Sequence, residues 1–266
     1  MLMQSRKQFL ESVVIGAIAI ACMVGIGALQ RPRLARLQNA SQTMTQDAAE
    51  RAEQAKEIQL RFLDYAPDFG FDNLLADWVF LNFVQYFGDT PAREHTGYRL
   101  SPEYFDVILA RDPYFRLGYF FLSASTSLYA GMPQRTVDII ERELPNLSPT
   151  LPDKAYYVWR YKGIDELLFL GDTAAARESF NKVTEWASVY SDKESQQIAQ
   201  SSAQTVQFLK SNPDSRSAQI SVWTMVFNNA FDEATQQLAI TQMRNLGATV
   251  STDQNGNLQV SLPKEQ

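Results

Sequence analysis

The sequence predicts an all-α protein, a solenoid of helical hairpins with an N-terminal transmembrane helix and a small C-terminal β-hairpin. Large aromatic residues recur about every 40 positions at the start of apolar helical runs, which indicates a repeat. An unbroken apolar run lies near the N-terminus, and apolar and polar residues alternate near the C-terminus. Each of these three observations predicts one part of the fold.

Composition limits the class of protein. The chain has 266 residues, of which 45% are hydrophobic and 20% charged, as is typical of one or two folded domains. Its formal net charge is -6 and the basic residues form no stripe, which argues against nucleic acid as a partner. The single cysteine, Cys22, provides neither a disulfide framework nor a thiolate metal cluster and favours a reducing compartment.

The apolar run covers residues 13–29, with the sequence VVIGAIAIACMVGIGAL. A helix of this length rises roughly 26 Å, which nearly matches the hydrocarbon core of a bilayer. We therefore expect residues 1–30 to form a single-pass membrane anchor. A cleaved signal peptide is the alternative, because the N-terminus is basic and Gly27-Ala28 supplies small residues for cleavage. Glu11, just before the run, and the three arginines that would directly follow the cut argue against cleavage.

Basic residues on the two sides of this run predict its orientation. Three arginines follow the run, and one arginine and one lysine precede it: Arg31, Arg33, Arg36, Arg6 and Lys7. The positive-inside rule therefore favours a cytoplasmic repeat domain. Residues 31–66 are rich in alanine and charged or amide side chains and predict a polar helical stalk, which ends before Pro67 and Gly70.

The repeat lies in residues 72–190. An aromatic residue begins each of three apolar runs, and a glycine ends each run: Trp78 and Gly88, Tyr119 and Gly131, Trp159 and Gly171. A second helical segment follows each glycine. We expect three helical hairpins that bury their apolar faces against one another. Gly163, four residues after Trp159, is a small residue that would let two helices approach closely.

At these residues the sequence resembles the tetratricopeptide repeat (TPR) family. Five residues match the family's second-helix pattern: Ala176, Phe180, Ser101, Phe105 and Pro113. The sequence departs from the pattern at Asn82, in a lengthened first turn (residues 89–100), and in the second and third units, where the glycine comes one residue late. The segments FDNLLADWVFLNFVQYFGD and YFDVILARDPYFRLGYFF also resemble a degenerate TPR family of membrane-anchored bacterial proteins, including cyanobacterial ones.

The resemblance implies that the first helices of successive hairpins line a concave binding face. Five residues on those helices are then expected to contact a protein partner: Phe83, Tyr86, Phe120, Tyr157 and Arg160. Aromatic residues and arginine are frequent interface anchors. Of the five, we expect the arginine to be the best ligand contact, because an arginine is less easily buried than an aromatic ring.

The C-terminal part is less regular. Residues 191–247 predict three further helices, in which Trp223, Val226, Phe227 and Phe231 supply the apolar contacts of a capping layer. Residues 248–263 predict a β-hairpin. A three-residue loop pairs Val250 with Val260 and Thr252 with Leu258, which places the apolar pairs on one face.

Residues capable of catalysis are few. His95 is the only histidine and lies in a polar turn where a solvated side chain is expected, and motifs for phosphate binding or for an activated serine are absent. The acidic pairs Asp165-Glu166 and Glu141-Glu143 are expected to lie on solvated faces. We expect no catalytic residue, no cofactor and no metal site.

Together these features predict a membrane-anchored, non-catalytic adaptor that binds a protein client during assembly or stabilisation of a membrane complex. The cyanobacterial resemblance implies the thylakoid membrane and a photosynthetic complex. A cell-envelope component of secretion or pilus machinery is one alternative, and an enzyme with a site between helices is another.

Overall fold

The computed structural model describes residues 16, 23, 25–31, 45–65, 67, 70–211, 213–230, 232–252 and 258–262. The chain forms two compact units, Met1–Thr45 and Gln46–Gln266, and the second contains the repeats. Most of the predicted membrane span, residues 13–29, lies outside the described residues and stays a prediction. Among the described helices, none combines the length and the apolarity that crossing a bilayer requires.

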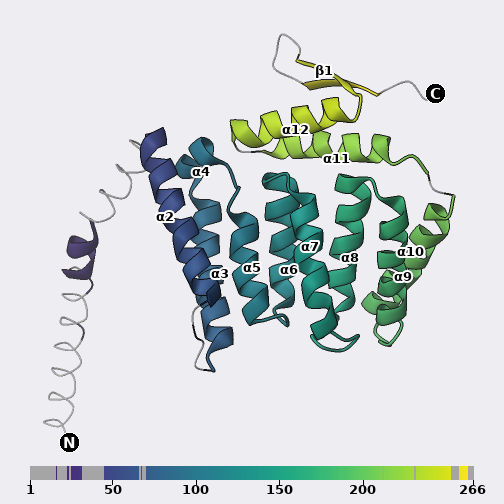
Figure 1. Ribbon diagram of the computed structural model, residues 1–266, viewed down its shortest axis with the longest axis horizontal. Coiled ribbons are helices and arrows are strands. Elements are labelled where there is room, and N and C mark those ends of the chain that lie inside the picture. The colour runs from purple at the N-terminus through teal and green to yellow at the C-terminus, as the bar shows by residue number, and fades with distance from the viewer. Residues whose placement is uncertain are drawn as a thin grey trace, which may run out of the picture. The chain divides into compact units, whose positions relative to one another are not determined.

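Helical hairpins form the second unit, as predicted (Figure 1). Its helices up to residue 209 are α2 (Gln46–Tyr65), α3 (Asp72–Gly88), α4 (Thr90–Thr96), α5 (Ser101–Arg111), α6 (Arg116–Leu122), η1 (Ser123–Tyr129), α7 (Pro133–Glu143), η2 (Leu144–Asn146), α8 (Tyr156–Asp165), η3 (Glu166–Leu170), α9 (Thr173–Ala187) and α10 (Lys193–Leu209). The three hairpins pair α3 with α5, α6 and η1 with α7, and α8 and η3 with α9.

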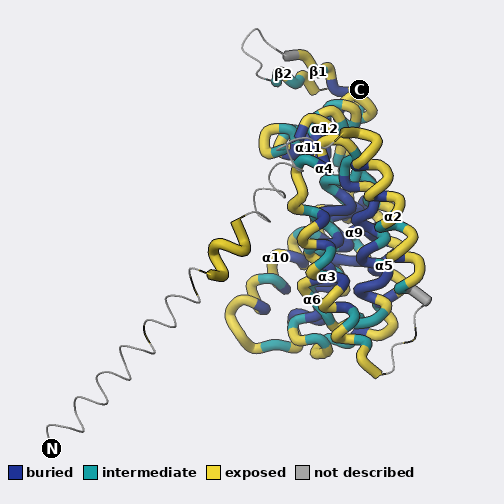
Figure 2. Tube along the Cα trace, turned by 90° about the vertical axis from the view of Figure 1, so that its left-hand side faces the viewer, coloured by how far each residue is buried: buried dark blue, intermediate teal, exposed yellow. Residues whose placement is uncertain are grey.

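The hairpins stack into two layers. Figure 2 shows α3, α6 and α10 on one side of the unit and α2, α5 and α9 on the other. Neighbouring helices within a layer are also in contact: α6 contacts α8, and α5 contacts α7. A continuous hydrophobic core lies between the layers, and its largest side chains include Phe83, Tyr104, Phe105, Tyr119 and Tyr156. This arrangement is that of a solenoid, in which each hairpin is buried mainly by its neighbours.

Two π-helical segments, η1 and η3, end the first helices of the second and third hairpins. A π-helix results when one extra residue is accommodated inside an α-helix. These are the hairpins in which the sequence places the glycine one residue late. The extra residue is therefore absorbed within the helix, and the turn at Gly131 or Gly171, each with positive φ, is preserved.

The first helix of the unit corrects one expectation. Residues 46–65 were predicted as part of a polar stalk, but α2 packs against α4 and α5 and belongs to the solenoid. Ala49, Glu53 and Leu60 are its buried residues. The helix is polar overall because only a narrow strip of it faces the core, and a charged residue occupies the middle of that strip.

The long first turn also differs from expectation. Residues 89–100 contain a short helix, α4, which begins with Pro91 in its first turn and ends before Gly97, where φ is positive. Arg93 of this helix is buried, with 4% of its surface exposed. His95 is exposed, as predicted.

The C-terminal cap consists of α11 (Arg216–Asn229) and α12 (Glu233–Asn245), which lie across the ends of the hairpins in Figure 1. Helix α10, predicted as part of the cap, instead packs along α9 and extends the solenoid. Trp223 and Val226 are buried in the cap, and Phe169 of η3 meets Trp223 edge to face at 5.2 Å. The cap therefore rests on the π-helical ends of the hairpins.

A two-stranded antiparallel sheet, β1 (Thr249–Thr252) and β2 (Leu258–Ser261), follows the cap. Val250 pairs with Val260, and Thr252 with Leu258, so the predicted register is confirmed. The predicted loop between the strands lies outside the described residues. Val250, Leu258 and Val260 pack against the cap, as an alternating pattern with one buried face requires.

Candidate partner-binding surface

Three of the predicted contact residues lie at the surface of the first-helix layer. Phe120 on α6 is 46% exposed, and Tyr157 and Arg160 on α8 are partly exposed. Helices α6 and α8 contact each other. The solenoid therefore brings together side chains from two successive hairpins.

Tyr161 joins these residues into one aromatic row. Its ring centroid lies 5.9 Å from that of Phe120 and 6.1 Å from that of Tyr157. The guanidinium of Arg116, at the start of α6, lies 5.4 Å from the centre of the Tyr157 ring. We call Arg116, Phe120, Tyr157, Arg160 and Tyr161 the aromatic-arginine surface.

Tyr157 is held in place from the neighbouring helix. Its hydroxyl donates a hydrogen bond of 2.5 Å to Glu194 in the first turn of α10. Burial and this hydrogen bond raise the pKa of Tyr157, whereas the nearby charge of Arg160 lowers it. Burial likewise raises the pKa of Tyr161, and the charges of Arg116 and Arg160 oppose the effect. Both arginines are therefore near enough for their charges to act on the tyrosine hydroxyls.

The two arginines of this surface have no carboxylate partner among the described residues. Within the described residues, neither Arg116 nor Arg160 forms an ion pair or a side-chain hydrogen bond. Other arginines of the solenoid do form ion pairs: Arg93, Arg99, Arg111, Arg135 and Arg142. In a chain with net charge -6, two unpaired guanidiniums beside exposed rings make a local positive site that can accept carboxylates.

The other two predicted contact residues are buried, which corrects the prediction for them. Phe83 is 1% exposed and packs against Phe105 at 4.6 Å and Tyr104 at 5.7 Å. Tyr86 is 7% exposed. Both point between the layers rather than outward, because the second helix of their hairpin offers an aromatic face that excludes water.

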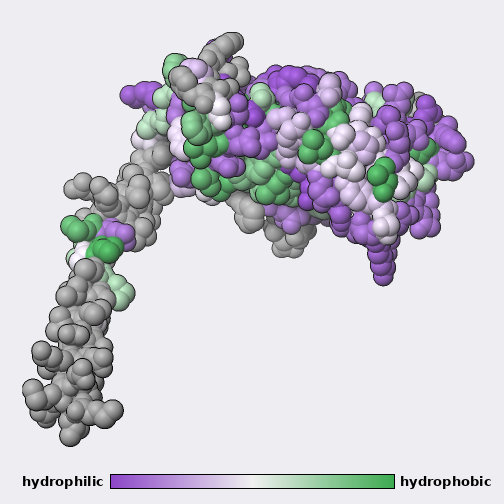
Figure 3. All heavy atoms as spheres, turned by 90° about the horizontal axis from the view of Figure 1, so that it is seen from below, coloured by the Kyte–Doolittle hydropathy of each residue, from purple (hydrophilic) through white to green (hydrophobic). Residues whose placement is uncertain are grey.

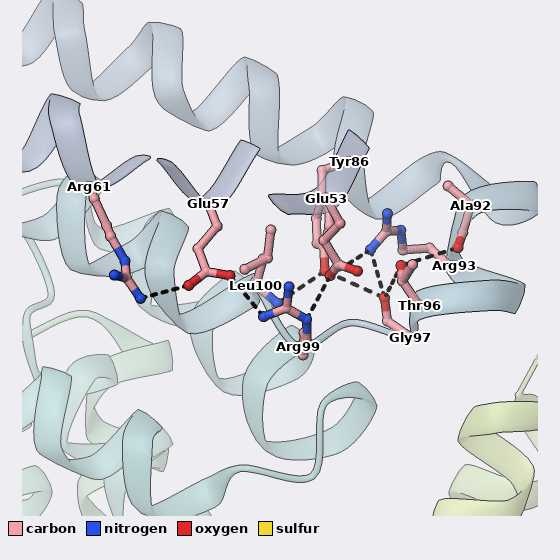
Figure 4. Close-up of polar contacts among 10 residues, drawn as sticks. All are labelled: Glu53, Glu57, Arg61, Tyr86, Ala92, Arg93, Thr96, Gly97, Arg99 and Leu100. Atoms are coloured by element: carbon pink, nitrogen blue, oxygen red, sulfur yellow. Dashed lines mark hydrogen bonds and ion pairs between the residues drawn. The ribbon is translucent and has the colours of Figure 1, made fainter. Parts of the chain in front are cut away.

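Tyr86 belongs to a polar network between α2, α4 and the turn before α5, drawn in Figure 4. Its hydroxyl accepts a hydrogen bond of 3.1 Å from the backbone N–H of Leu100, and the guanidinium of Arg93 lies 3.8 Å from its ring centre. Arg93 also donates a 2.7 Å hydrogen bond to the carbonyl of Gly97. Burial raises the pKa of Tyr86 to about 12.

Glu53 connects α2 to this network. Its carboxylate lies 3.7 Å from Arg93 and 3.5 Å from Arg99, and Arg99 also pairs with Glu57 at 3.0 Å. Burial raises the pKa of Glu53, while the Thr96 hydroxyl and the two arginines act in the opposite direction. A buried carboxylate requires such partners. The network therefore fixes the register of α2 on the solenoid and is a structural site.

The acidic pairs require a further correction. Asp165 and Glu166, predicted to be solvated, are 0% and 2% exposed. They lie where α8 passes into η3, and the π-helical turn directs both carboxyls into the protein. Glu143 is also buried, whereas the side chain of Glu141 is 56% exposed as expected.

Asp165 has a pKa far above its ordinary value. Burial raises its pKa to about 7, and the charge of Glu166 adds to the effect. The hydroxyls of Ser123 and Ser127 on η1 lie close enough to lower the pKa, but neither carboxyl oxygen accepts a hydrogen bond of ordinary geometry. Asp165 is enclosed and does not reach the aromatic-arginine surface, so we assign it to the packing of η1 against α8.

Helix α3 has an exposed apolar face that the sequence did not lead us to predict. Leu74, Trp78 and Leu81 are 64%, 44% and 60% exposed, and Phe71 precedes them at 65%. Figure 3 shows green side chains gathered at this end of the unit, seen from below. The signal was visible in DNLLADWVFLNFVQYFG, which is apolar around its whole circumference, whereas a surface helix normally has one polar face.

Comparison with known proteins finds no match. No family model, no curated protein and no solved structure matches the chain.

Proposed function

We propose that this protein is a membrane-anchored, TPR-like adaptor that binds a protein client through the aromatic-arginine surface. The observation that carries the proposal is the pair of unpaired arginines, Arg116 and Arg160, beside partly exposed rings on successive hairpins. Arginine and tyrosine are the side chains most often found where binding energy is concentrated. Carboxylates of the client form ion pairs with the two guanidiniums, and an apolar segment of the client packs on the rings.

The client we propose is a membrane complex under assembly or stabilisation. Residues 13–29 would hold the adaptor at the bilayer, and the cyanobacterial resemblance of the first hairpin favours the thylakoid. The described unit supports binding over catalysis, because the surface groups nearest one another are rings and guanidiniums, which bind anions and stack but do not exchange protons near neutral pH.

Arg160→Ala and Arg116→Ala should each weaken recovery of the client from detergent-solubilised membranes by about tenfold, because each removes one charge-assisted contact. The double variant should abolish recovery. Melting temperatures should stay nearly unchanged, because neither arginine has an ion-pair partner within the described residues. Quantitative mass spectrometry of pull-downs from membranes measures recovery, and circular dichroism measures melting.

Arg177→Ala is the matched control. Arg177 lies on α9 in the opposite layer and forms no ion pair within the described residues, so its loss should leave client recovery intact. Equal recovery by wild type and the double variant would remove the surface from the binding site. An early melting transition for Arg160→Ala would show that this arginine is structural.

The anchor is tested separately. Full-length protein should stay with membranes through high-salt and carbonate washing, because residues 13–29 are long and apolar enough to span a bilayer. Immunoblotting of the washed fractions measures retention. Release of full-length protein by carbonate would reject the span, and a mature N-terminus near Leu29 would establish the signal-peptide alternative.

A further inference from the structure

The edge of the solenoid opposite the cap carries an exposed apolar side chain at each of its four turns. These turns lie along the lower side of Figure 1, before α3 and between α5 and α6, α7 and α8, and α9 and α10. Each has a large apolar residue with an exposed fraction between 45% and 65%: Phe71, Tyr114, Leu151 and Val189. We call these four residues the apolar edge.

The turns at the other end of the hairpins differ. Residues 89–100, 130–132 and 171–172, all of them described, include no exposed large apolar residue. A single apolar residue in a surface turn needs no explanation, because such residues are common on soluble proteins. Their recurrence at all four turns of one end, and at none of these three turns of the other, indicates that the apolar edge meets something other than water.

The four residues form a line rather than one contiguous patch. Helices that pack within a layer are roughly 8–10 Å apart, so neighbouring turns are separated by about that distance. Figure 3 looks onto this edge and shows green side chains at intervals along it, with purple ones between. A protein interface normally has a contiguous, closely packed apolar centre, which this spacing does not provide. A fluid bilayer requires no matching shape and can accept each side chain separately.

The charges beside the apolar edge indicate the kind of lipid. Within three positions of its residues the sequence has five carboxylates and three cations: Asp68, Asp72, Asp112, Asp153, Asp192, Arg111, Arg116 and Lys154. Anionic membranes bind segments with clusters of lysine and arginine, and these three cations form no such cluster. The excess of carboxylates is repelled by anionic headgroups and can pair with the ammonium of a zwitterionic one.

We propose that the apolar edge lies on a bilayer of zwitterionic or uncharged lipids and inserts its four side chains below the headgroups. Tyr114 suits this position, because its ring is apolar and its hydroxyl can remain at the level of the headgroups. At the α3 end, Phe71 borders an apolar hollow of about 440 Å³, which extends the contact. The other residues that line this hollow are Pro67, Leu74, Leu75 and Trp78. The contact goes beyond the proposed adaptor function and does not depend on its client.

Fluorescence quenching by lipid tests the insertion. The full-length protein, with Cys22→Ala and one new cysteine that carries a nitrobenzoxadiazole fluorophore, is reconstituted into phosphatidylcholine vesicles. Some of the lipids bear a nitroxide on the acyl chain near the headgroup. Fluorophores at Leu151→Cys and Val189→Cys should lose emission to the nitroxide, because both positions insert. Phe208→Cys is the matched control and should lose none, since Phe208 is also exposed, at 65%, but lies at the far end of α10.

Serine substitutions test whether the four residues act together. With the fluorophore at Leu151→Cys, changing the other three residues of the apolar edge to serine should remove most of the quenching. Phe208→Ser with Met225→Ser removes two exposed apolar residues away from the edge and should leave the quenching unchanged. All of these side chains are exposed, so melting temperatures should change little.

Three results would overturn the proposal: no quenching at either turn, quenching at residue 208 as strong as at residue 151, or a triple serine variant quenched as strongly as its parent. Energy transfer between fluorophores on separate copies, without quenching by lipid, would instead assign the edge to an interface between copies. Partial replacement of the lipid by phosphatidylglycerol should weaken the quenching, and stronger quenching would overturn the choice of lipid. The triple variant should recover its client normally from detergent, because the aromatic-arginine surface is intact, so the two proposals can fail separately.

Discussion

Asp165→Asn should raise the melting temperature of the protein above pH 7 by on the order of 5–15 °C. The wild-type carboxyl has a pKa of about 7 when folded, against an ordinary value of 3.8, because burial opposes its ionisation. Ionising this carboxyl above pH 7 costs the folded state on the order of 2–4 kcal/mol, and an amide avoids that cost.

The sign of this effect depends on pH. Below about pH 4 the carboxyl is protonated in both folded and unfolded protein, so variant and wild type should melt alike. From pH 4 to pH 7 the folded protein keeps a proton that the unfolded chain has lost, so wild-type stability falls as the pH rises. The advantage of the variant should grow across this interval and then level off.

Thermal melts at intervals between pH 4 and pH 9 measure the effect, and Asp138→Asn is the control. Asp138 is exposed on α7, so replacing it should shift the melting temperature little at any pH. An advantage of Asp165→Asn that is constant across the whole range would show that the carboxyl does not titrate near pH 7.

Gly163→Leu should lower the free energy of unfolding by about 1–3 kcal/mol, because the site has no room for a side chain. A Cβ at Gly163 would lie 3.2 Å from the Phe180 ring and 3.2 Å from Cβ of Ser179, both on α9. The close approach of α8 and α9 that the sequence predicted is present. Urea denaturation followed by circular dichroism measures the loss.

Gly88→Leu supplies the matched control. Gly88 ends α3, and no atom lies within 4 Å of a Cβ built there. Its substitution should change the free energy of unfolding by less than about 0.5 kcal/mol. If both leucine variants lose the same stability, the effect comes from the backbone rather than from the contact between α8 and α9.

The hairpins could be predicted because their signals are local in sequence. The spacing of aromatic residues and glycines located the three hairpins. The alternation of apolar and polar residues near the C-terminus predicted the strand register, in which Val250 pairs with Val260. Both signals depend on residues close to one another along the chain. The sequence also showed that Gly131 and Gly171 each come one residue later than the repeat pattern requires. The π-helical segments η1 and η3 account for this, because each holds one extra residue within the helix before the glycine.

Burial of individual side chains could not be predicted in the same way. Phe83 and Phe120 are the same residue type on equivalent helices, yet one is 1% and the other 46% exposed. The difference comes from neighbours that approach only in the folded protein, such as Phe105 beside Phe83. Glu53 is buried because Arg93 and Arg99, some forty positions away, surround it. Spacing within one helix does not reveal such partners.

The π-helical segments also determine which changes of length the protein can accept. Gly131 lies against Leu238 of α12 and Gly171 against Gln219 of α11, since a Cβ at either glycine would come within 2.8 Å of those side chains. Deleting one residue from η3 would restore ordinary α-helical spacing, rotate Gly171 by about 100° about the helix axis and separate it from the cap. Most surface loops tolerate insertions and deletions, but we expect the turns at Gly131 and Gly171 not to tolerate them. Homologous chains that carry the cap should therefore have second and third hairpins of the same length as those in this chain.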